Sequence, residues 1–122
     1  MHNFKDLKVW QKSIKLAVEV YQAASLLPSE ERSGLVSQMK RCSVSISSNI
    51  AEGSGRGSSA QFKYFFNISQ GSAFELETQL IISNWLELLD GNLSTSLIEK
   101  TTEIQKMSYA LDKSIKVWVL RL

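Results

Sequence analysis

The sequence predicts an all-α protein folded as an antiparallel, up-down-up-down four-helix bundle. Its 122 residues suit a single domain with one core, and we treat residues 1–122 as that domain. One proline and six glycines divide the chain into four long segments. Within these segments, apolar residues recur at spacings of three and four, as on one face of a helix. Short connections then favour antiparallel neighbours.

The first two predicted helices span about residues 5–26 and 28–52. Pro28 suits the first turn of the second helix, where Glu30 and Glu31 would complement the helix dipole. Residues 42–47 also alternate with a period of two, so a short strand remains an alternative there. The apolar stripe of the second helix comprises Leu35, Met39, Cys42, Ile46 and Ile50.

The third and fourth helices are expected at about 58–90 and from 94–96 to 122. Ser58 with Gln61, and Ser96 with Glu99, have the spacing of capping boxes. Gly91 is placed to end the third helix in a left-handed conformation. The stripe of the fourth helix comprises Leu97, Ile104, Met107, Leu111, Ile115, Trp118 and Leu122.

The first and third helices each carry two apolar stripes. We assign to the core Leu7, Trp10, Ile14, Ala17, Tyr21, Phe62, Phe65, Phe66, Ala73, Leu76 and Leu80. The second stripes comprise Val9, Leu16, Val20 and Leu27 in the first helix, and Phe74, Ile81, Trp85 and Leu88 in the third. A soluble monomer rarely exposes such patches, so we predict that the second stripes form a homo-oligomer interface. A wider core contact is the alternative.

The composition, with no secretory signal in the sequence, predicts a soluble protein. The chain is 43% hydrophobic and 21% charged, which is ordinary for a globular domain. Charged residues begin at Lys5, no secretory signal follows, and no apolar run could cross a bilayer. We therefore expect a cytoplasmic protein without membrane contact. The only cysteine, Cys42, is expected to be a small buried hydrophobe.

Residues for catalysis or metal binding are scarce. The only histidine is His2, which disfavours Ser-His and Cys-His catalysis, and no Cys/His cluster suits zinc. The glycine-rich turn at 53–57 lacks the lysine and hydroxyl residue of a P-loop. We expect no enzyme activity, cofactor or metal. Glu52, at the unfavourable end of a helix dipole, should have its own hydrogen-bonding partner.

Positive charge is the remaining candidate for chemistry. Lys5, Lys8, Lys12 and Lys15 repeat at spacings of three and four, so they should form a row that can follow a phosphate backbone of RNA or DNA. Arg41 and Arg56 would supplement that row with bidentate contacts. Residues 1–67 contain nine basic and five acidic residues. Solvation of a helix face is the alternative explanation of the lysines.

Four sequence blocks resemble a known family. They are Phe4-x-x-Leu7-x-x-Trp10-Gln11, Pro28-x-x-Glu31-x-x-Gly34-Leu35-x-x-Gln38-x-x-Arg41, Ser45-Ile46-x-x-Asn49-Ile50-Ala51-Glu52-Gly53-x-Gly55-Arg56 and Gly71-Ser72-x-x-Glu75-Leu76-Glu77-Thr78. In this order they resemble the bacterial 23S rRNA intervening-sequence proteins, over nearly the whole chain. Ser33 departs from the aromatic residue usual before the glycine.

The resemblance implies a four-helix bundle that assembles as a homopentameric ring. A similar bundle is the accessory protein of diversity-generating retroelements, where it associates with reverse transcriptase and RNA. The resemblance therefore suggests nucleic-acid binding, with a nucleic-acid-processing protein as a further partner. The alternative is an interaction scaffold or accessory subunit that recruits a protein without binding nucleic acid itself.

Overall fold

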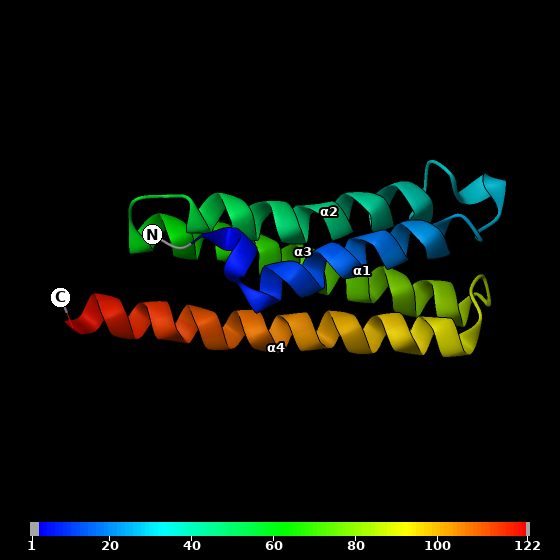
Figure 1. Cartoon of the computed structure of the whole chain (residues 1–122). Helices are drawn as coiled ribbons and strands as arrows, with labels where there is room; N and C mark the ends of the chain where they lie inside the picture. Colours follow the sequence, from blue (N-terminus) through cyan, green and yellow to red (C-terminus); the bar gives the residue numbers. More distant parts are fainter. Residues whose placement is uncertain (1–2, 122) are drawn as a thin grey trace.

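The computed structural model describes the backbone of residues 3–121 and the side chains of residues 3–115. It consists of the helices α1 (Lys8–Ala24), α2 (Leu35–Ser54), α3 (Ser59–Trp85) and α4 (Gly91–Arg121), with the short 3-10 turns η1 (Phe4–Asp6) and η2 (Ser29–Glu31). The prediction of an all-α four-helix bundle is confirmed. Residues 42–47 lie within α2, so the strand alternative is wrong. Figure 1 shows the chain reversing direction at each of its three connections.

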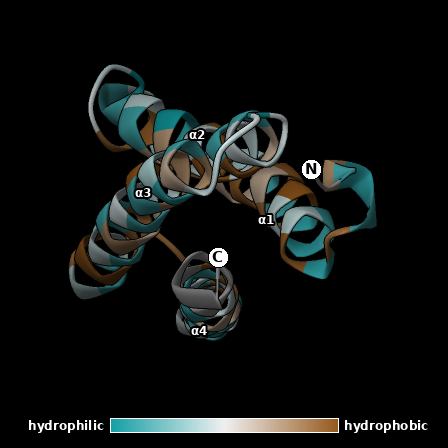
Figure 2. Ribbon diagram, turned by 90° about the vertical axis from the view of Figure 1, so that its left-hand side faces the viewer, coloured by the Kyte–Doolittle hydropathy of each residue, from teal (hydrophilic) through white to brown (hydrophobic). Residues whose placement is uncertain are grey.

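The helices pack in a ring that follows their order in the chain. Each contacts its sequence neighbours, and α4 closes the ring against α1, whereas the described residues show no contact between α2 and α4. Viewed along the bundle, α4 stands on the far side of α1 and α3 from α2 (Figure 2). Along residues 3–121, no helix is both long and apolar enough to span a membrane.

The closest packing joins α2 to α3 through small side chains. Ser69 donates a hydrogen bond to the Ile46 carbonyl at 2.9 Å, and Ser72 donates to the Ser45 hydroxyl at 2.8 Å. Near the end of α2, a Cβ on Gly53 would lie 3.0 Å from the Phe62 carbonyl oxygen. Serine and glycine let the two helices approach closely, and the hydrogen bonds satisfy the hydroxyls that this packing buries.

The core face of α1 differs from the prediction. Val9, Leu16, Val20 and Leu27, which we had assigned to an oligomer interface, are all buried in the core of the single chain. Ile14 and Tyr21, assigned to the core, are instead 38% and 44% exposed. Both stripes have helical spacing, and the position of α1 between α2 and α4 decides which one is covered. The interface prediction is wrong for these four residues.

The other core stripes agree with the sequence. Met39, Cys42, Ile46 and Ile50 of α2 are buried, as are Phe62, Phe66, Ala73, Leu76 and Leu80 of α3. In α4, Leu97, Ile104 and Ile115 are buried, and Met107 and Leu111 pack against the core. The side chains of Trp118 and Leu122 lie outside the described residues, as does His2.

The helix boundaries required several corrections. Pro28 precedes η2, and α2 begins only at Leu35. The left-handed residue after α3 is Glu87, with φ of 58°, while Gly91 opens α4. Asp90 Oδ2 accepts hydrogen bonds from the first amides of α4, so Ser96 lies inside the helix and is not its cap. The Ser58 cap of α3 is confirmed, because its hydroxyl accepts from the Gln61 amide.

Candidate functional site

The predicted lysine row is divided between two elements. Lys5 belongs to η1, where its ammonium group lies 5.9 Å from the centre of the Phe4 ring. Lys8, Lys12 and Lys15 share one exposed edge of α1, which we call the lysine edge. An ion pair between Lys12 and Glu103 shows that this edge borders α4. Three of the four lysines therefore form a continuous row.

Charged side chains of α4 form ion pairs with α1 along the lysine edge. Lys12 pairs with Glu103 at 2.9 Å, and Lys100 of α4 pairs with Glu19 at 2.6 Å. Between these ion pairs lies a hollow of about 260 Å³, whose lining includes Lys15 and the apolar side chains Leu16 and Ile104. The hollow is lined by three lysines and two glutamates, so its net charge remains positive.

The two ion pairs leave the lysines accessible to an anion. The Lys12 and Glu103 side chains are 46% and 53% exposed, and such exposed pairs contribute at most about 1 kcal/mol to stability. A phosphate group can therefore displace Glu103 at little cost. Lys100 belongs to this surface although we had not predicted it. Only the antiparallel placement of α1 and α4, which the periodicity of α4 does not reveal, brings it beside Glu19.

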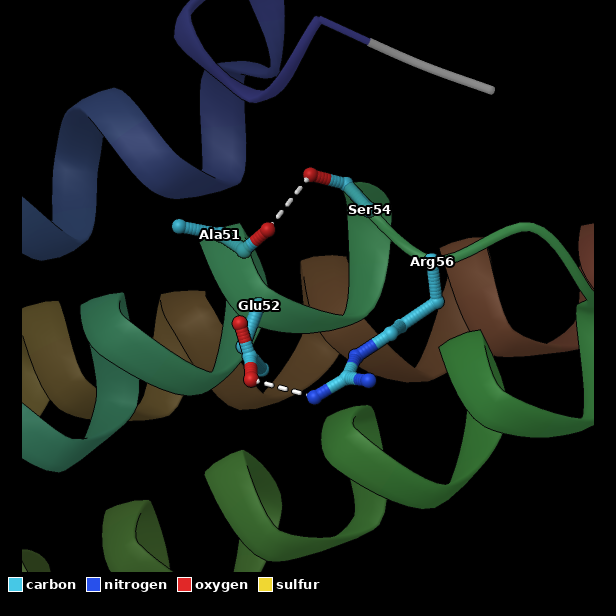
Figure 3. A network of polar contacts seen from close by, with 4 residues as sticks. All are labelled: Ala51, Glu52, Ser54 and Arg56. Atoms are coloured by element: carbon cyan, nitrogen blue, oxygen red, sulfur yellow. Dashed lines mark hydrogen bonds and ion pairs between the residues drawn. The ribbon is translucent and has the colours of Figure 1, made fainter.

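Arg41 and Arg56 do not join the lysine edge. Arg41 is exposed on α2, which has no contact with α4 among the described residues. Arg56 Nη2 lies 2.5 Å from Glu52 Oε1, and its guanidinium stacks 4.9 Å from the centre of the Phe65 ring. Figure 3 shows this pair beside the last turn of α2, where the Ser54 hydroxyl donates to the Ala51 carbonyl. The prediction that Glu52 has its own partner is confirmed. Arg56 binds Glu52 and the Phe65 ring at the end of α2.

An exposed apolar surface lies on α3. Its outward side, which we call the outer α3 face, comprises Tyr64, Ile68, Gly71, Phe74, Ile82 and Trp85. Phe74 is 55% and Trp85 81% exposed. Of the interface residues predicted on this helix, these two are open, while Ile81 is half-buried. Leu88, predicted with them, lies beyond the helix and packs against the core.

A second apolar surface lies where α1 meets α2. It comprises Ile14, Val18 and Tyr21 from α1 and Val44 from α2, all exposed, and we call it the seam patch. Lys40, one turn before Val44, places its ammonium group 5.0 Å from the centre of the Tyr21 ring. Figure 2 shows α1 and α3 on opposite sides of the bundle, and their backbones do not approach each other in the described chain, so the seam patch and the outer α3 face occupy different sides of the bundle.

The described bundle has no cluster of metal ligands and no reactive thiol. In this part of the chain, no three His, Cys, Asp or Glu side chains lie together as metal ligands would. Burial raises the pKa of the Cys42 thiol, and a hydrogen bond from Gln79 Nε2 at 3.4 Å acts in the opposite direction. A buried thiol of raised pKa is a poor nucleophile, in agreement with the prediction that Cys42 is a core residue.

A solved structure and a family model both match this chain. The chain has a TM-score of 0.80 and 28% identity to a protein of unknown function from the S23 ribosomal protein family of Bacteroides thetaiotaomicron. That match covers 86% of this chain and 95% of the other. Among curated proteins, none matches.

The family model is described as the 23S rRNA-intervening sequence protein, and it matches residues 5–110. This span includes the last three sequence blocks, all but Phe4 of the first, and most of the bundle, from η1 into α4. The chain belongs to the 23S rRNA-intervening sequence protein family.

Proposed function

We propose that this protein is a non-enzymatic homo-oligomer that binds nucleic acid through contacts to phosphate groups. The observation that carries the proposal is the outer α3 face, with its open Phe74 and Trp85. Soluble proteins cover apolar surfaces of this kind, and a second copy of the same chain is always available to do so. The family description, which refers to intervening sequences of 23S rRNA, supports a nucleic-acid ligand.

The positions of the two apolar surfaces favour a ring over a two-fold dimer. If the outer α3 face of one copy meets the seam patch of the next, the contact joins two different surfaces. Repeating such a contact generates a closed ring when the rotation closes. A pentamer is the ring that the family resemblance implies. Its subunit contact would join the outer α3 face to the seam patch, in place of the interface predicted for the buried residues of α1.

Assembly would strengthen binding to a polyanion. The net charge of each chain is only +2, which is too small for strong binding by one copy. In a ring, the lysine edge of each copy would repeat around the assembly, and several weak contacts to one nucleic acid would act together. The lysine edge thus becomes effective only when the chain is assembled.

The mass of the protein in solution tests this proposal. We expect light scattering to give a multiple of the 13.7 kDa chain that grows when a short RNA duplex is added. Between about 50 and 200 mM salt the complex should dissociate, because phosphate contacts release bound counterions. A monomer that is indifferent to RNA would refute both parts of the proposal.

Charge-matched variants test the lysine edge itself. Replacing Lys8, Lys12 and Lys15 by glutamine should greatly weaken RNA binding at low salt. The control replaces Lys63, Lys106 and Lys113, which lie on α3 and α4 and do not line the α1–α4 hollow. If both sets weaken binding equally, overall charge is responsible and the lysine edge is not the binding surface.

A protein-recruiting scaffold is the second candidate function, and the seam patch favours it. Apolar side chains on α1 and α2 would bind a partner protein, while Lys12 would remain paired with Glu103. Apolar docking depends little on salt, whereas phosphate contacts weaken steeply as salt rises. The salt dependence of binding therefore distinguishes the two functions.

A further inference from the structure

A second hollow lies where α1 turns into α2. Its volume is about 380 Å³, and its polar lining comes from Ser25, Ser29, Arg32 and Lys40. Leu27 and Val36 contribute apolar walls. The lining residues come from the end of α1, from η2 and from the start of α2, so three short segments enclose the space. We call it the turn hollow.

The turn hollow differs from the α1–α4 hollow in its charge. Two cationic side chains line it and no carboxylate does. In the described part of the chain, neither Arg32 nor Lys40 forms an ion pair. Lys40 is half-buried, and its ammonium group lies 5.0 Å from the centre of the Tyr21 ring. Cations held together without a counterion attract an anion.

The nearest acidic residues do not neutralise this site. Glu30 and Glu31 belong to η2, and neither lines the turn hollow. Glu31 Oε1 accepts a hydrogen bond from the Leu35 amide at 3.4 Å, which directs its carboxylate to the start of α2. Arg32 and Lys40 are therefore the charged groups that a ligand in the hollow would meet.

The remaining groups suit a phosphate that carries a sugar. The Ser29 hydroxyl forms no hydrogen bond within the described residues and can donate to a phosphate oxygen beside Arg32. Leu27 and Val36 offer an apolar wall to a sugar. Arginine pairs with phosphate in a bidentate geometry.

We propose that the turn hollow binds the 5′-phosphate of a nucleotide, either a free nucleotide or the end of a nucleic-acid strand. If the 5′-phosphate belongs to a nucleic-acid strand, the inference rests on the proposed function. If it belongs to a free nucleotide, the inference is independent of that function. It also separates two kinds of contact. The lysine edge would follow an internal backbone, whereas the turn hollow would hold one phosphate group between two cations.

Methyl NMR spectra of the full-length protein test the proposal. The ligands are adenosine 5′-monophosphate and ten-residue oligoadenylates with and without a 5′-phosphate. We expect saturable shifts of the Leu27 and Val36 methyl groups with the monophosphate or the phosphorylated strand. The strand with a free 5′-hydroxyl should produce none. Shifts with the monophosphate identify a free nucleotide as sufficient, and shifts with the phosphorylated strand alone identify a strand end.

Variants connect the shifts to the two cations. Arg32→Gln with Lys40→Gln should weaken the affinity at least about tenfold, because each removes a charged donor. Lys106→Gln with Lys113→Gln removes the same charge outside the hollow and outside the lysine edge, and should leave the affinity unchanged. Arg32 is exposed, so Arg32→Gln alone should fold normally and give a smaller loss.

Two results would overturn the inference. One is the absence of saturable Leu27 and Val36 shifts with every phosphorylated ligand. The other is equal weakening by the hollow variants and by their control. If either occurs while the RNA duplex still binds the assembled protein, the turn hollow fails and the proposed function stands. If the monophosphate shifts the methyl groups while the duplex does not bind, the turn hollow stands as a nucleotide site and the proposed function fails.

Discussion

The two faces of α3 follow different rules. The inner face buries Phe66, Leu76 and Leu80 against the other helices, with serines at the closest approaches. The outer α3 face has side chains as large, including Phe74 and Trp85, but no other part of the described chain covers them. Apolar residues on both sides of one helix indicate burial on both sides. The single chain provides only one of the two contacts.

Gly53 on α2 and Gly71 on α3 show the same difference between a surface packed within the chain and an open surface. Gly53 faces α3, and a Cβ there would press on the Phe62 carbonyl oxygen and the Phe65 Cβ, each at 3.0 Å. Gly71 lies in the middle of the outer α3 face, where a Cβ would meet nothing within 4 Å. Packing within the chain explains the first glycine. It gives no reason for the second, which a closely approaching neighbour would explain.

Removing an inner aromatic ring should have the largest effect. Phe66 is fully buried, so Phe66→Ala should lower the free energy of unfolding by about 3–5 kcal/mol through lost burial and a new cavity. Denaturant titration measures this loss. Phe74→Ala on the outer face is the matched control, and at concentrations where the protein is monomeric it should change stability by less than about 0.5 kcal/mol. Equal losses would contradict the assignment of the two faces.

Filling the space at Gly53 should have the next largest effect. Gly53→Ala should destabilise the protein by about 1–3 kcal/mol, because α2 and α3 must move apart to admit one methyl group. Gly55→Ala is the control, since its Cβ would meet its nearest neighbour at 3.6 Å. Thermal unfolding of the two variants checks the difference. A stabilised Gly53→Ala would show that the α2–α3 contact is looser than described.

The same substitution at Gly71 should act in the opposite direction. Alanine is favoured over glycine inside a helix by about 1 kcal/mol, and nothing in the chain obstructs it. Gly71→Ala should therefore stabilise the monomer by about that amount, as measured by denaturant titration under dilute conditions. Light scattering at high concentration gives the second result. A lower assembled mass would indicate that a neighbouring copy approaches the helix at this position.

The sequence predicts the fold better than it predicts which stripe of a helix is buried. The four helices follow from periodicity, and so do the inner faces of α2 and α4, because each of these two helices has a single apolar stripe. In α3, which has two apolar stripes, the stripe predicted to face the core is the buried one. In α1, the stripe with Val9, Leu16 and Val20 competes with the stripe that contains Trp10 and Tyr21. Periodicity does not rank them. Small neighbours of the buried stripe, Ser13 and Ala23, were the available signal, because they permit close packing.

Surface sites depend on contacts that spacing does not contain. The alignment of Lys8, Lys12 and Lys15 follows from helical geometry, but the pairing of Lys12 with Glu103 requires the placement of α4. The i,i+4 spacing of Glu52 and Arg56 already allows their ion pair, whereas the contact of Arg56 with the Phe65 ring requires the approach of α3 to α2. The turn hollow does not follow from spacing, because part of its lining, including Ser25 and Leu27, comes from the end of α1. Only the path of the chain through η2 brings these residues beside Arg32 and Lys40.

Substitutions on the outer α3 face should change the stability of the monomer least and the assembly of the protein most. Phe74→Ser with Trp85→Ser removes two open aromatic side chains, so the free energy of unfolding of the dilute monomer should change by less than about 0.5 kcal/mol. In the wild type, assembly stabilises the folded chain by mass action, so its Tm should rise with protein concentration. The double variant should lose that dependence and scatter light as a monomer. Tyr109→Ser on α4, also at an exposed aromatic position, is the control and should keep both properties. A double variant that still assembles would assign the oligomer contact to another surface, and the seam patch would be the next to test.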